Sequence, residues 1–463
     1  MPLIIGAKSA SAATGVANSC RFNKADSAYL TKTSGTATNV DICTLSAWIK
    51  RSTLTSNDEI IMGEYTDGSN RGKLLFNADQ LHYHEVTGGG TTASLKITRV
   101  LRDPAAWYHI IVAFDTTQGT DTDRIKFYIN GVQETDFETT TYPSQNGNVR
   151  INESSVPQFI GQAGTTGTYF DGYMAEVCFI DGQQLTPSSF GEFDEDSPTI
   201  WKPIDVSGLT FGNNGFYFNF EDSADLGADV SGNSNDFTAT NIDATDQATD
   251  TPANNFATGN PLSNPRVVSS TVYLPTYSNG NNTINHANAS YYTGDRSSIG
   301  VMSGKWYVEA ECSAVGDELF IGLTSEENHS EIDTTYLYED DGTFGGSAYG
   351  SAYVSGDIIQ IAFDATNGTV WFGLNGTWQN SATAEEIQNG TTTNAAASGL
   401  TMTKFWHIAS KGYNGATWNF NFGGCPAFTV SSGNADGDGY GNFEYAPPSG
   451  YYALCTKNLA EYG

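Results

Sequence analysis

The side chains of this chain that could take part in chemistry are mainly carboxylates and tyrosines in two glycine-containing stretches. The first, 221–236, reads EDSADLGADVSGNSND and contains Asp225, Asp229, Asn233 and Asn235. Hard cations such as calcium bind several oxygen atoms from closely spaced loop residues, so these four side chains are candidate calcium ligands. Asp and Asn also form turns by bonding their own backbone, and the stretch alone does not separate the two interpretations.

The second stretch, 326–356, reads EENHSEIDTTYLYEDDGTFGGSAYGSAYVSG. Long loops in compact domains are usually functional, and this one combines aromatic rings with acids. Rings can stack on sugar faces while carboxylates accept bonds from hydroxyls. The candidate ligand-binding residues are Tyr336, Tyr338, Asp340, Asp341, Tyr349 and Tyr353. The alternative is that these tyrosines pack beneath the loop or form subunit contacts.

Catalysis is not indicated by the arrangement of the acids. A glycosidase needs two carboxylates facing one another, about 5–5.5 Å apart in retaining enzymes or about 6.5–9.5 Å apart in inverting ones. The nearest string, GEFDEDS, contains Glu192, Asp194, Glu195 and Asp196 but lacks the apolar alternation of a strand. We expect a solvated acidic turn there, and we expect no enzyme.

Histidines and nucleophiles also lack a catalytic setting. His82 and His84 occupy alternate positions of one predicted strand and would share a face, but no third metal ligand is identified for them. No G-x-S-x-G motif lies in a strand–turn–helix context. The sequence therefore predicts no catalytic residues and no certain cofactor, with calcium as the one metal to consider.

Two similar segments, some 250 residues apart, suggest the architecture that positions these groups. WYHIIVAFDTTQGTDTDRIKFYINGVQ begins at Trp107, and DIIQIAFDATNGTVWFGLNGTWQ begins at Asp357. Both alternate apolar and polar residues with period two, turn, and then reach the tight-turn pairs Asn130-Gly131 and Asn375-Gly376. We expect an equivalent β-hairpin in each half of the chain, each within its own β-sandwich.

The composition supports an all-β protein with two antiparallel β-sandwiches. The 463 residues include 50 Gly, 25 Phe, 24 Tyr and 8 Trp, and no window shows a sustained helical stripe. The best short helix lies in 183–195, with Thr186 as N-cap and Pro187 at N1. The predicted domains are an arm at 1–19, a sandwich at 20–242, a linker or strap at 243–266, a sandwich at 267–424, and a tail at 425–463 packed on the second domain.

The net charge of the chain limits the classes of molecule that it can bind. The chain has 21 basic and 52 acidic residues, a formal charge of −31, which repels nucleic acids and anionic membranes. No run of 18 apolar residues is present, so we expect no membrane insertion. The six cysteines form no C-x-x-C pair, and Cys43, Cys178 and Cys312 lie in strand-like runs as small buried side chains. We expect folding in a reducing compartment, and the N-terminal residues do not resemble a signal peptide.

Each half also resembles a known family. TLSAWIKRS, WYHIIVAFD, IKFYINGV and YFDGYMAEVCFIDGQQLTPSSFGEF follow one another in the first half, which resembles the laminin-G-like/concanavalin-like sandwich. SGKWYVEAEC, FIGLTS, GDIIQIAFDATNGTVWFGLNGTW and WNFNFGG, in the second half, resemble a SPRY domain. The first resemblance implies a jelly roll that often holds calcium at its rim. The second implies a non-catalytic recognition module whose loops bind partners.

The combination resembles bacteriophage virion proteins. This resemblance rests on the segments GFYFNFEDSADLGADVSGNSNDFTATNI, TPANNFATGNPL and PSGYYALCTKNL. The resemblance implies a protein of the virion surface, assembled in the host cytoplasm with other virion proteins. We expect a tail fibre or tail spike that recognises a bacterial surface glycan, as a homo-oligomer and most simply a trimer. A capsid decoration, cement or head-fibre protein is the alternative, and a polysaccharide depolymerase is a weaker one.

Overall fold

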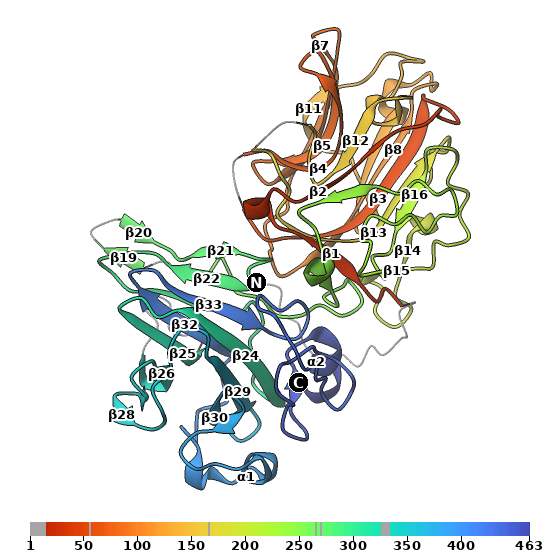
Figure 1. Cartoon of the computed structure of the whole chain (residues 1–463). Helices are drawn as coiled ribbons and strands as arrows, with labels where there is room; N and C mark the ends of the chain where they lie inside the picture. The colour runs from red at the N-terminus through yellow and green to blue at the C-terminus, as the bar shows by residue number, and fades with distance from the viewer. Residues whose placement is uncertain (1–14, 55–56, 165–166, 264–265, 269–270, 326–333) are drawn as a thin grey trace. The chain divides into compact units, whose positions relative to one another are not determined.

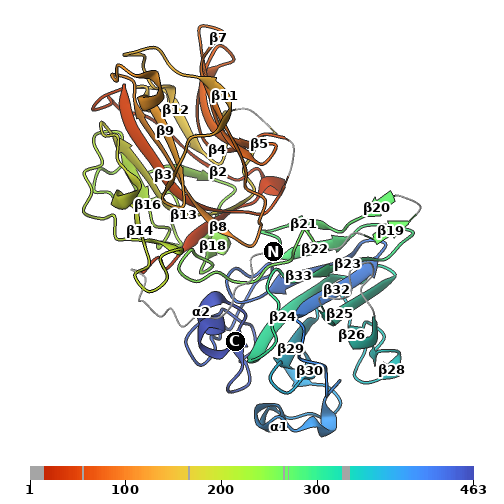
Figure 2. The ribbon, with the colours of Figure 1, turned by 180° about the vertical axis from the view of Figure 1, so that it is seen from behind.

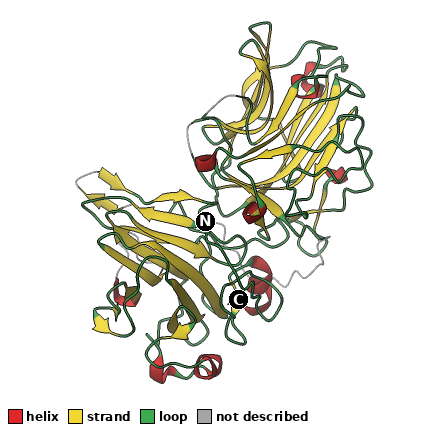
Figure 3. Cartoon of the chain, in the orientation of Figure 1, coloured by secondary structure: helices red, strands yellow, loops and turns green. Residues whose placement is uncertain are grey.

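The protein is described by a computed structural model that covers residues 15–54, 57–164, 167–263, 266–268, 271–325 and 334–463. Strands dominate these residues (Figure 3), which confirms the predicted all-β class. They form two compact units, with the boundary between Ala253 and Asn254. Within the described ranges, no helix has both the length and the apolar character that a membrane crossing requires.

The first unit is a sandwich of two antiparallel sheets, here called sheet A and sheet B (Figure 1). In spatial order, sheet A contains β10 (Val132–Glu134), β9 (Ile125–Ile129), β8 (Trp107–Asp115), β3 (Ile42–Arg51), β13 (Gly172–Asp181), β1 (Ser19–Phe22) and β18 (Gln247–Ala248), with β16 (Phe216–Phe218) paired to β13. Sheet B contains β11 (Phe137–Thr141), β7 (Gly90–Val100), β6 (Gln80–Thr87), β5 (Asn70–Asn77), β4 (Glu59–Asp67), β12 (Pro157–Ile160), β2 (Tyr29–Thr33) and β17 (Thr238–Thr240). Alternate side chains of both sheets meet in one apolar core.

The outer face of sheet A is covered by its own chain. Ile111, Cys178 and Ile180 point away from the main core and pack under Phe190 and Phe211 of the following segment. That segment contains the small hairpin β14 (Gly191–Phe193) and β15 (Trp201–Pro203). The short 3₁₀ turns of this unit are η1 (Lys24–Asp26), η2 (Asp121–Asp123), η3 (Arg150–Asn152), η4 (Pro187–Ser189) and η5 (Ala244–Asp246).

The second unit is also a sandwich, of sheets C and D (Figure 2). Sheet C contains β21 (Thr276–Ser278), β22 (Thr283–His286), β33 (Ala416–Asn421), β24 (Lys305–Ala314), β29 (Ile358–Asp364), β30 (Thr369–Leu374) and β31 (Thr377–Trp378), with β34 (Tyr452–Ala453) parallel to β24. Sheet D contains β23 (Thr293–Arg296), β32 (Trp406–Tyr413), β25 (Glu318–Ser325), β26 (Leu337–Glu339), β27 (Thr343–Phe344) and β28 (Ser347–Ala348). Outside the sandwich lie β19 (Arg266–Val268), β20 (Thr271–Tyr273), η6 (Thr334–Tyr336), η7 (Thr392–Asn394), α1 (Ala384–Asn389) and α2 (Thr456–Tyr462).

The two similar segments do form equivalent hairpins, β8–β9 and β29–β30. Asn130 and Asn375 follow the second strands with φ values of 49° and 48°. Each asparagine side chain also accepts a hydrogen bond from the backbone at the start of its hairpin, from His109 in the first and from Ile358 in the second. The repeated Asn-Gly pair therefore closes the same turn in both sandwiches, as the sequence predicts.

Three features refine the sequence-based boundaries. Residues 243–253, the start of the predicted linker, belong to the first unit through η5 and β18, and the unit boundary falls inside the linker range. The predicted helix near Thr186 is only the 3₁₀ turn η4, and the Thr186 side chain does not cap it. All six cysteines are free and buried, which confirms the prediction for Cys43, Cys178 and Cys312.

The C-terminal residues cover the outer face of sheet C. Tyr307 and Trp371 point outward from that sheet and pack against Phe443, Tyr451 and other tail residues. Glu309, fully buried on β24, holds the tail because its carboxylate accepts the backbone N–H groups of Glu444 and Tyr445, each at 2.8 Å.

Replacing Glu309 with Ala should destabilise the second unit. The substitution leaves two partly buried N–H groups without an acceptor, and each such loss costs about 1–3 kcal/mol. We expect a drop of about 2–4 kcal/mol in the free energy of unfolding, measured by urea denaturation, and earlier proteolysis of the tail. Glu311→Ala is the matched control, because Glu311 is only partly buried and bonds the Asn419 side chain. Equal losses in the two variants would contradict the role of Glu309.

Candidate functional site

The tyrosine-rich loop does not present its rings to solvent. Tyr338 and Tyr353 are 0% and 2% exposed and belong to the core of the second sandwich. The Tyr338 hydroxyl donates to the Ser351 carbonyl, and the Tyr353 hydroxyl donates to the Leu319 carbonyl at 2.6 Å. The expectation that these two rings bind a ligand is therefore wrong, because the loop folds into β26–β28 and turns them inward.

The other four predicted residues of this loop also make internal contacts. Tyr336 packs edge-on against Trp406, and the Tyr349 hydroxyl accepts the backbone N–H of Phe372 at 3.2 Å. Asp340 accepts the backbone N–H of Leu319 at 3.0 Å, and the exposed Asp341 accepts that of Thr343 at 2.8 Å. Asp341 is the one member of the set with an exposed side chain. Residues 326–333 of the stretch lie outside the described residues.

The candidate calcium ligands organise a loop instead of surrounding a cation. Asp229 accepts hydrogen bonds from the backbone N–H groups of Tyr217, Ser231 and Asn235 at 2.8–2.9 Å. Asp225 accepts the N–H of Gly227 at 3.1 Å.

The two amides of the set point their donor atoms inward. The side-chain amides of Asn233 and Asn235 donate to the Gly215 carbonyl at 2.9 and 2.7 Å. Lys32 donates to the Asn235 side-chain oxygen, which places an ammonium among these groups. The four residues therefore do not fit a calcium site, and the turn-forming interpretation explains their contacts. Within the described ranges, no three His, Cys, Asp or Glu side chains are grouped as metal ligands would be.

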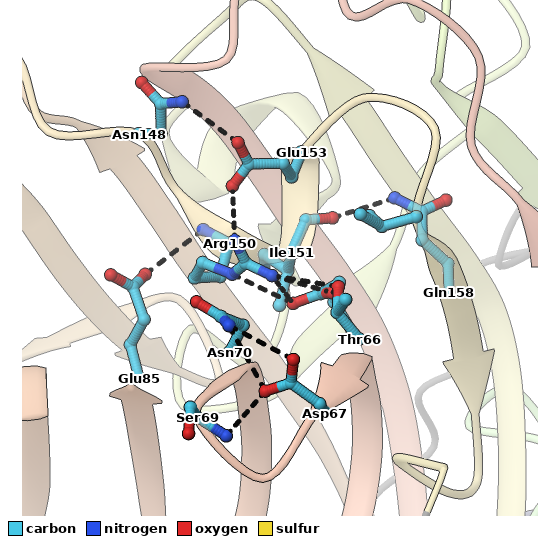
Figure 4. A network of polar contacts seen from close by, with 12 residues as sticks. Thr66, Asp67, Ser69, Asn70, Glu85, Asn148, Arg150, Ile151, Glu153 and Gln158 are labelled. Atoms are coloured by element: carbon cyan, nitrogen blue, oxygen red, sulfur yellow. Dashed lines mark hydrogen bonds and ion pairs between the residues drawn. The ribbon is translucent and has the colours of Figure 1, made fainter. Parts of the chain in front are cut away.

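Carboxylates are brought together inside the first sandwich, but an arginine occupies the space between them (Figure 4). Arg150 binds both oxygens of Glu64, at 3.0 and 2.9 Å, and its guanidinium also bonds Glu153 at 2.9 Å. Its backbone N–H donates to Glu85 at 3.1 Å. A side chain at Gly72, between the two strands, would lie 2.7 Å from Cβ of Arg150, so the glycine makes room for this ion pair. The network is buried and mutually satisfied, which suits structure rather than catalysis.

Glu176 is a buried carboxyl at an irregular position of sheet A. It lies at a β-bulge of β13 with φ 49°, and the Tyr217 hydroxyl donates to it at 2.6 Å. Burial raises the pKa of Glu176 to about 7, the tyrosine opposes the rise, and the charges of Glu221 and Asp205 add to it. A hydrogen-bonded tyrosine provides no second carboxylate for a glycosidase pair. The segment with Glu192 and Asp194 forms the β14–β15 hairpin, where both acids contact Lys202 at 3.3 Å.

Replacing Glu176 with Gln should change how stability depends on pH. A folded Glu176 keeps its proton up to about pH 7, whereas an unfolded glutamate loses it near pH 4.5. The stabilisation of the folded state by this protonated side chain is therefore fully present below pH 4.5 and is lost as the pH rises through 7. The wild-type first unit should lose about 2 kcal/mol more than the variant between pH 5 and pH 8, measured by urea unfolding. Glu195→Gln, at an exposed position whose charge does not act on Glu176, should behave like the wild type.

A partly exposed aromatic cluster lies elsewhere, at one end of sheet D. Tyr413 ends β32 directly opposite Glu318 of β25, and Tyr292 immediately precedes β23. The Tyr292 and Tyr413 rings meet edge-to-face at 4.6 Å, and the Tyr292 hydroxyl donates to Glu318. The ammonium of Lys411 lies 4.9 Å from the Tyr292 ring centroid. We call Tyr292, Tyr413, Glu318 and Lys411 the tyrosine platform.

The tyrosine platform combines the groups that bind sugars. Tyr292 and Tyr413 are partly exposed, so their rings can be reached from solvent, and Glu318 keeps acceptor capacity beside them. Burial and the adjacent Glu318 raise the pKa of Tyr292, so its hydroxyl stays protonated as a donor. The adjoining turn adds Asn414, whose amide donates to Asp317 at 2.9 Å. Sequence reasoning missed the platform because ASYYTGD and KGYNGAT are separated by more than a hundred residues and each contains little beyond a tyrosine.

Comparisons with known proteins agree with the fold of the first unit. Residues 23–189 match a family of laminin-G type described as the concanavalin A-like lectin/glucanases superfamily. The first sandwich is therefore a concanavalin-like jelly roll. No curated protein sequence matches the chain.

Three of the solved structures that are similar to this chain come from human, bacterial and mouse proteins. The SPRY domain of human HERC1 is 16% identical, with a TM-score of 0.25, over 32% of this chain and 91% of that one. A putative carbohydrate binding protein from Bacteroides ovatus is 16% identical, with a TM-score of 0.33, over 49% and 58%. Domains LG4-5 of the mouse laminin alpha1 chain are 10% identical, with a TM-score of 0.30, over 86% and 84%.

Proposed function

We propose that this chain is a structural protein of a bacteriophage virion, a tail fibre or tail spike component that binds a bacterial surface glycan without cleaving it. The observation that carries the glycan-binding part is the tyrosine platform, where two partly exposed rings and a carboxylate lie together at one end of sheet D, with the buried Lys411 ammonium against the Tyr292 ring. Sites on strands hold such groups more firmly than sites on loops. The lectin-type family of residues 23–189 is consistent with this proposal.

The virion part of the proposal rests on the sequence resemblance to phage structural proteins. The high negative charge agrees with it, because a protein present in many copies stays dispersed when the copies repel one another. Six buried free thiols suit assembly in a reducing cytoplasm. In this proposal the protein is displayed on the virion surface as a homo-oligomer, a trimer in the simplest case, together with other virion proteins and without nucleic acid or membrane insertion.

A capsid decoration or cement protein is the second candidate, and an apolar surface of the first unit favours it. Phe193 and Ile200 on and beside the β14–β15 hairpin are 42% and 47% exposed, and Val132 of β10 is 52% exposed. Trp201 joins the two elements because its ring lies against Gly131 and Gly191. Such residues would serve an assembly contact better than a sugar site.

A double variant, Tyr292→Ala with Tyr413→Ala, tests the glycan-binding proposal. Loss of both rings should weaken binding of the purified protein to polysaccharide from a susceptible host at least tenfold, because stacking on each ring supplies part of the affinity. Binding would be measured by biolayer interferometry, and adsorption by virions carrying the variant. Tyr169→Ala removes a partly exposed tyrosine of the first unit and should leave binding unchanged.

Three outcomes would contradict the proposal. Unchanged binding by a folded double variant would exclude the platform, and antibody labelling spread over the virion head would favour the decoration role. Shortening of the polysaccharide during incubation, abolished by Glu192→Gln or Asp194→Asn, would instead make the protein a depolymerase.

A further inference from the structure

The outer face of sheet B carries a set of basic and imidazole side chains. The inward positions of its strands hold Leu74, Tyr83 and Leu95, which belong to the core, so the neighbouring positions point outward. In register across β5, β6 and β7, Lys73 lies opposite His84, and His84 lies opposite Ser94. Strands are about 4.8 Å apart, so these three side chains form a continuous polar row.

A second row runs beside the first. His82 lies between Leu75 of β5 and Lys96 of β7. The His82 and His84 rings are 5.6 Å apart, as expected for alternate residues of one strand, and a ring nitrogen of His82 lies 2.9 Å from the Ser94 hydroxyl. Burial lowers the pKa of His82 to about 4 and that of His84 below its usual value. Both rings are therefore neutral at pH 7 and offer one donor and one acceptor each.

A loop limits this face on the side of β4. Ala163 is fully buried against Ile60 and Leu75, on the outer side of sheet B. Gly63 allows this contact, because a side chain there would lie 2.3 Å from Cβ of Ala163. The loop thus lies against the sheet next to the row that begins with Lys73.

Lys73 differs from the two most deeply buried cations of this unit, Lys50 and Arg51. Lys50 and Arg51 contact Asp250 and Glu59, each at 2.7 Å. Lys73 is half-buried and makes no hydrogen bond or ion pair with any residue that the structure describes. Taking an ammonium out of water without a partner is unfavourable. A protein with a formal charge of −31 nevertheless keeps this cation beside neutral donors on a sheet face.

The charges around Lys73 define what would complement it. Arg71 lies on the same outward side of β5, and its guanidinium is held by the Gly68 carbonyl. Asp58 attracts Lys73 electrostatically but bonds the Asn77 side chain, and Glu138 contacts Lys96 at 3.4 Å. The remaining unpaired charge of the row is therefore the positive one on Lys73, flanked by groups that suit hydroxyls.

We propose that the outer face of sheet B binds a carboxylate-bearing sugar of an acidic polysaccharide, with Lys73 pairing with the carboxylate and the partly exposed His84 bonding a ring hydroxyl. A chain of uronic acid units provides both groups on each ring. The negative field of the protein repels a polyanion in general, so a local unpaired cation would select where it binds. The proposal extends the glycan recognition proposed above to a second surface and to a defined ligand class, and it rests on that function for the polysaccharide.

The test is titration calorimetry of the full chain with oligogalacturonate, hyaluronan fragments and alginate fragments. Wild-type protein should bind at least one of them, and the methyl-esterified galacturonate should bind at least tenfold more weakly. Lys73→Gln should weaken binding at least tenfold and reduce its dependence on salt, because a charge pair is lost. His84→Ala should weaken it as well. Lys126→Gln, which removes a surface lysine from sheet A, should have no effect.

Several results would overturn the proposal. They are the absence of binding to all three uronates, equal binding by a folded Lys73→Gln variant, or binding only to sulfated polymers. The double variant of Tyr292 and Tyr413 separates the two proposals. Uronate binding that survives in it assigns the ligand to sheet B. If the protein binds host polysaccharide through the tyrosine platform but binds no uronate, the inference about sheet B is wrong and the proposed function is still supported.

Discussion

The alternation of side chains along each strand is the constraint on which the rest of the structure depends. Every second residue enters a core, so each sheet has an outer face that must be either covered or polar. In both units one sheet is covered by its own chain, sheet A by the segment around Phe211 and sheet C by tail residues such as Tyr451. The other sheet of each unit presents partly exposed polar and aromatic groups, represented by Lys73 and Tyr413. Both candidate surfaces follow from this division.

Burial shifts the pKa values of carboxyl groups and of histidines in opposite directions in this fold. Burial raises the pKa of four carboxyls to about 7, those of Glu59, Glu176, Asp295 and Glu309. It lowers the pKa of four imidazoles to about 3 or 4, those of His82, His109, His286 and His407. Between about pH 4.5 and pH 6.5, the folded state therefore binds more protons on these acids than the unfolded state does. Over the same range it binds fewer protons on these histidines. The two sets oppose one another in the linkage between pH and stability, and each unit contains two members of each set.

Sequence alone predicts the fold well and the candidate site poorly, for a physical reason. The hairpins ended by Asn130 and Asn375 are local, so alternation and turn chemistry are sufficient to place them. Whether a tyrosine binds a ligand depends on which way its strand faces, and a loop rich in Gly and Ser gives no period from which to infer this. Tyr338 and Tyr353 lie in the core, which the sequence of the loop did not indicate. Tyr292 contacts Tyr413 because β23 pairs with β32, which brings two distant segments of the chain together.

The division of each unit into one covered and one polar sheet also bears on affinity. Binding of a single sugar by a few exposed side chains is weak, because association must overcome the loss of translational and rotational freedom. A polysaccharide repeats its units, so under the two proposals above a polymer that reached both surfaces would be held twice. The second contact would then form at a high effective concentration. Under the proposed function, two modest surfaces on sheets would thus share the attachment, and the aromatic loop that the sequence first suggested would not be needed.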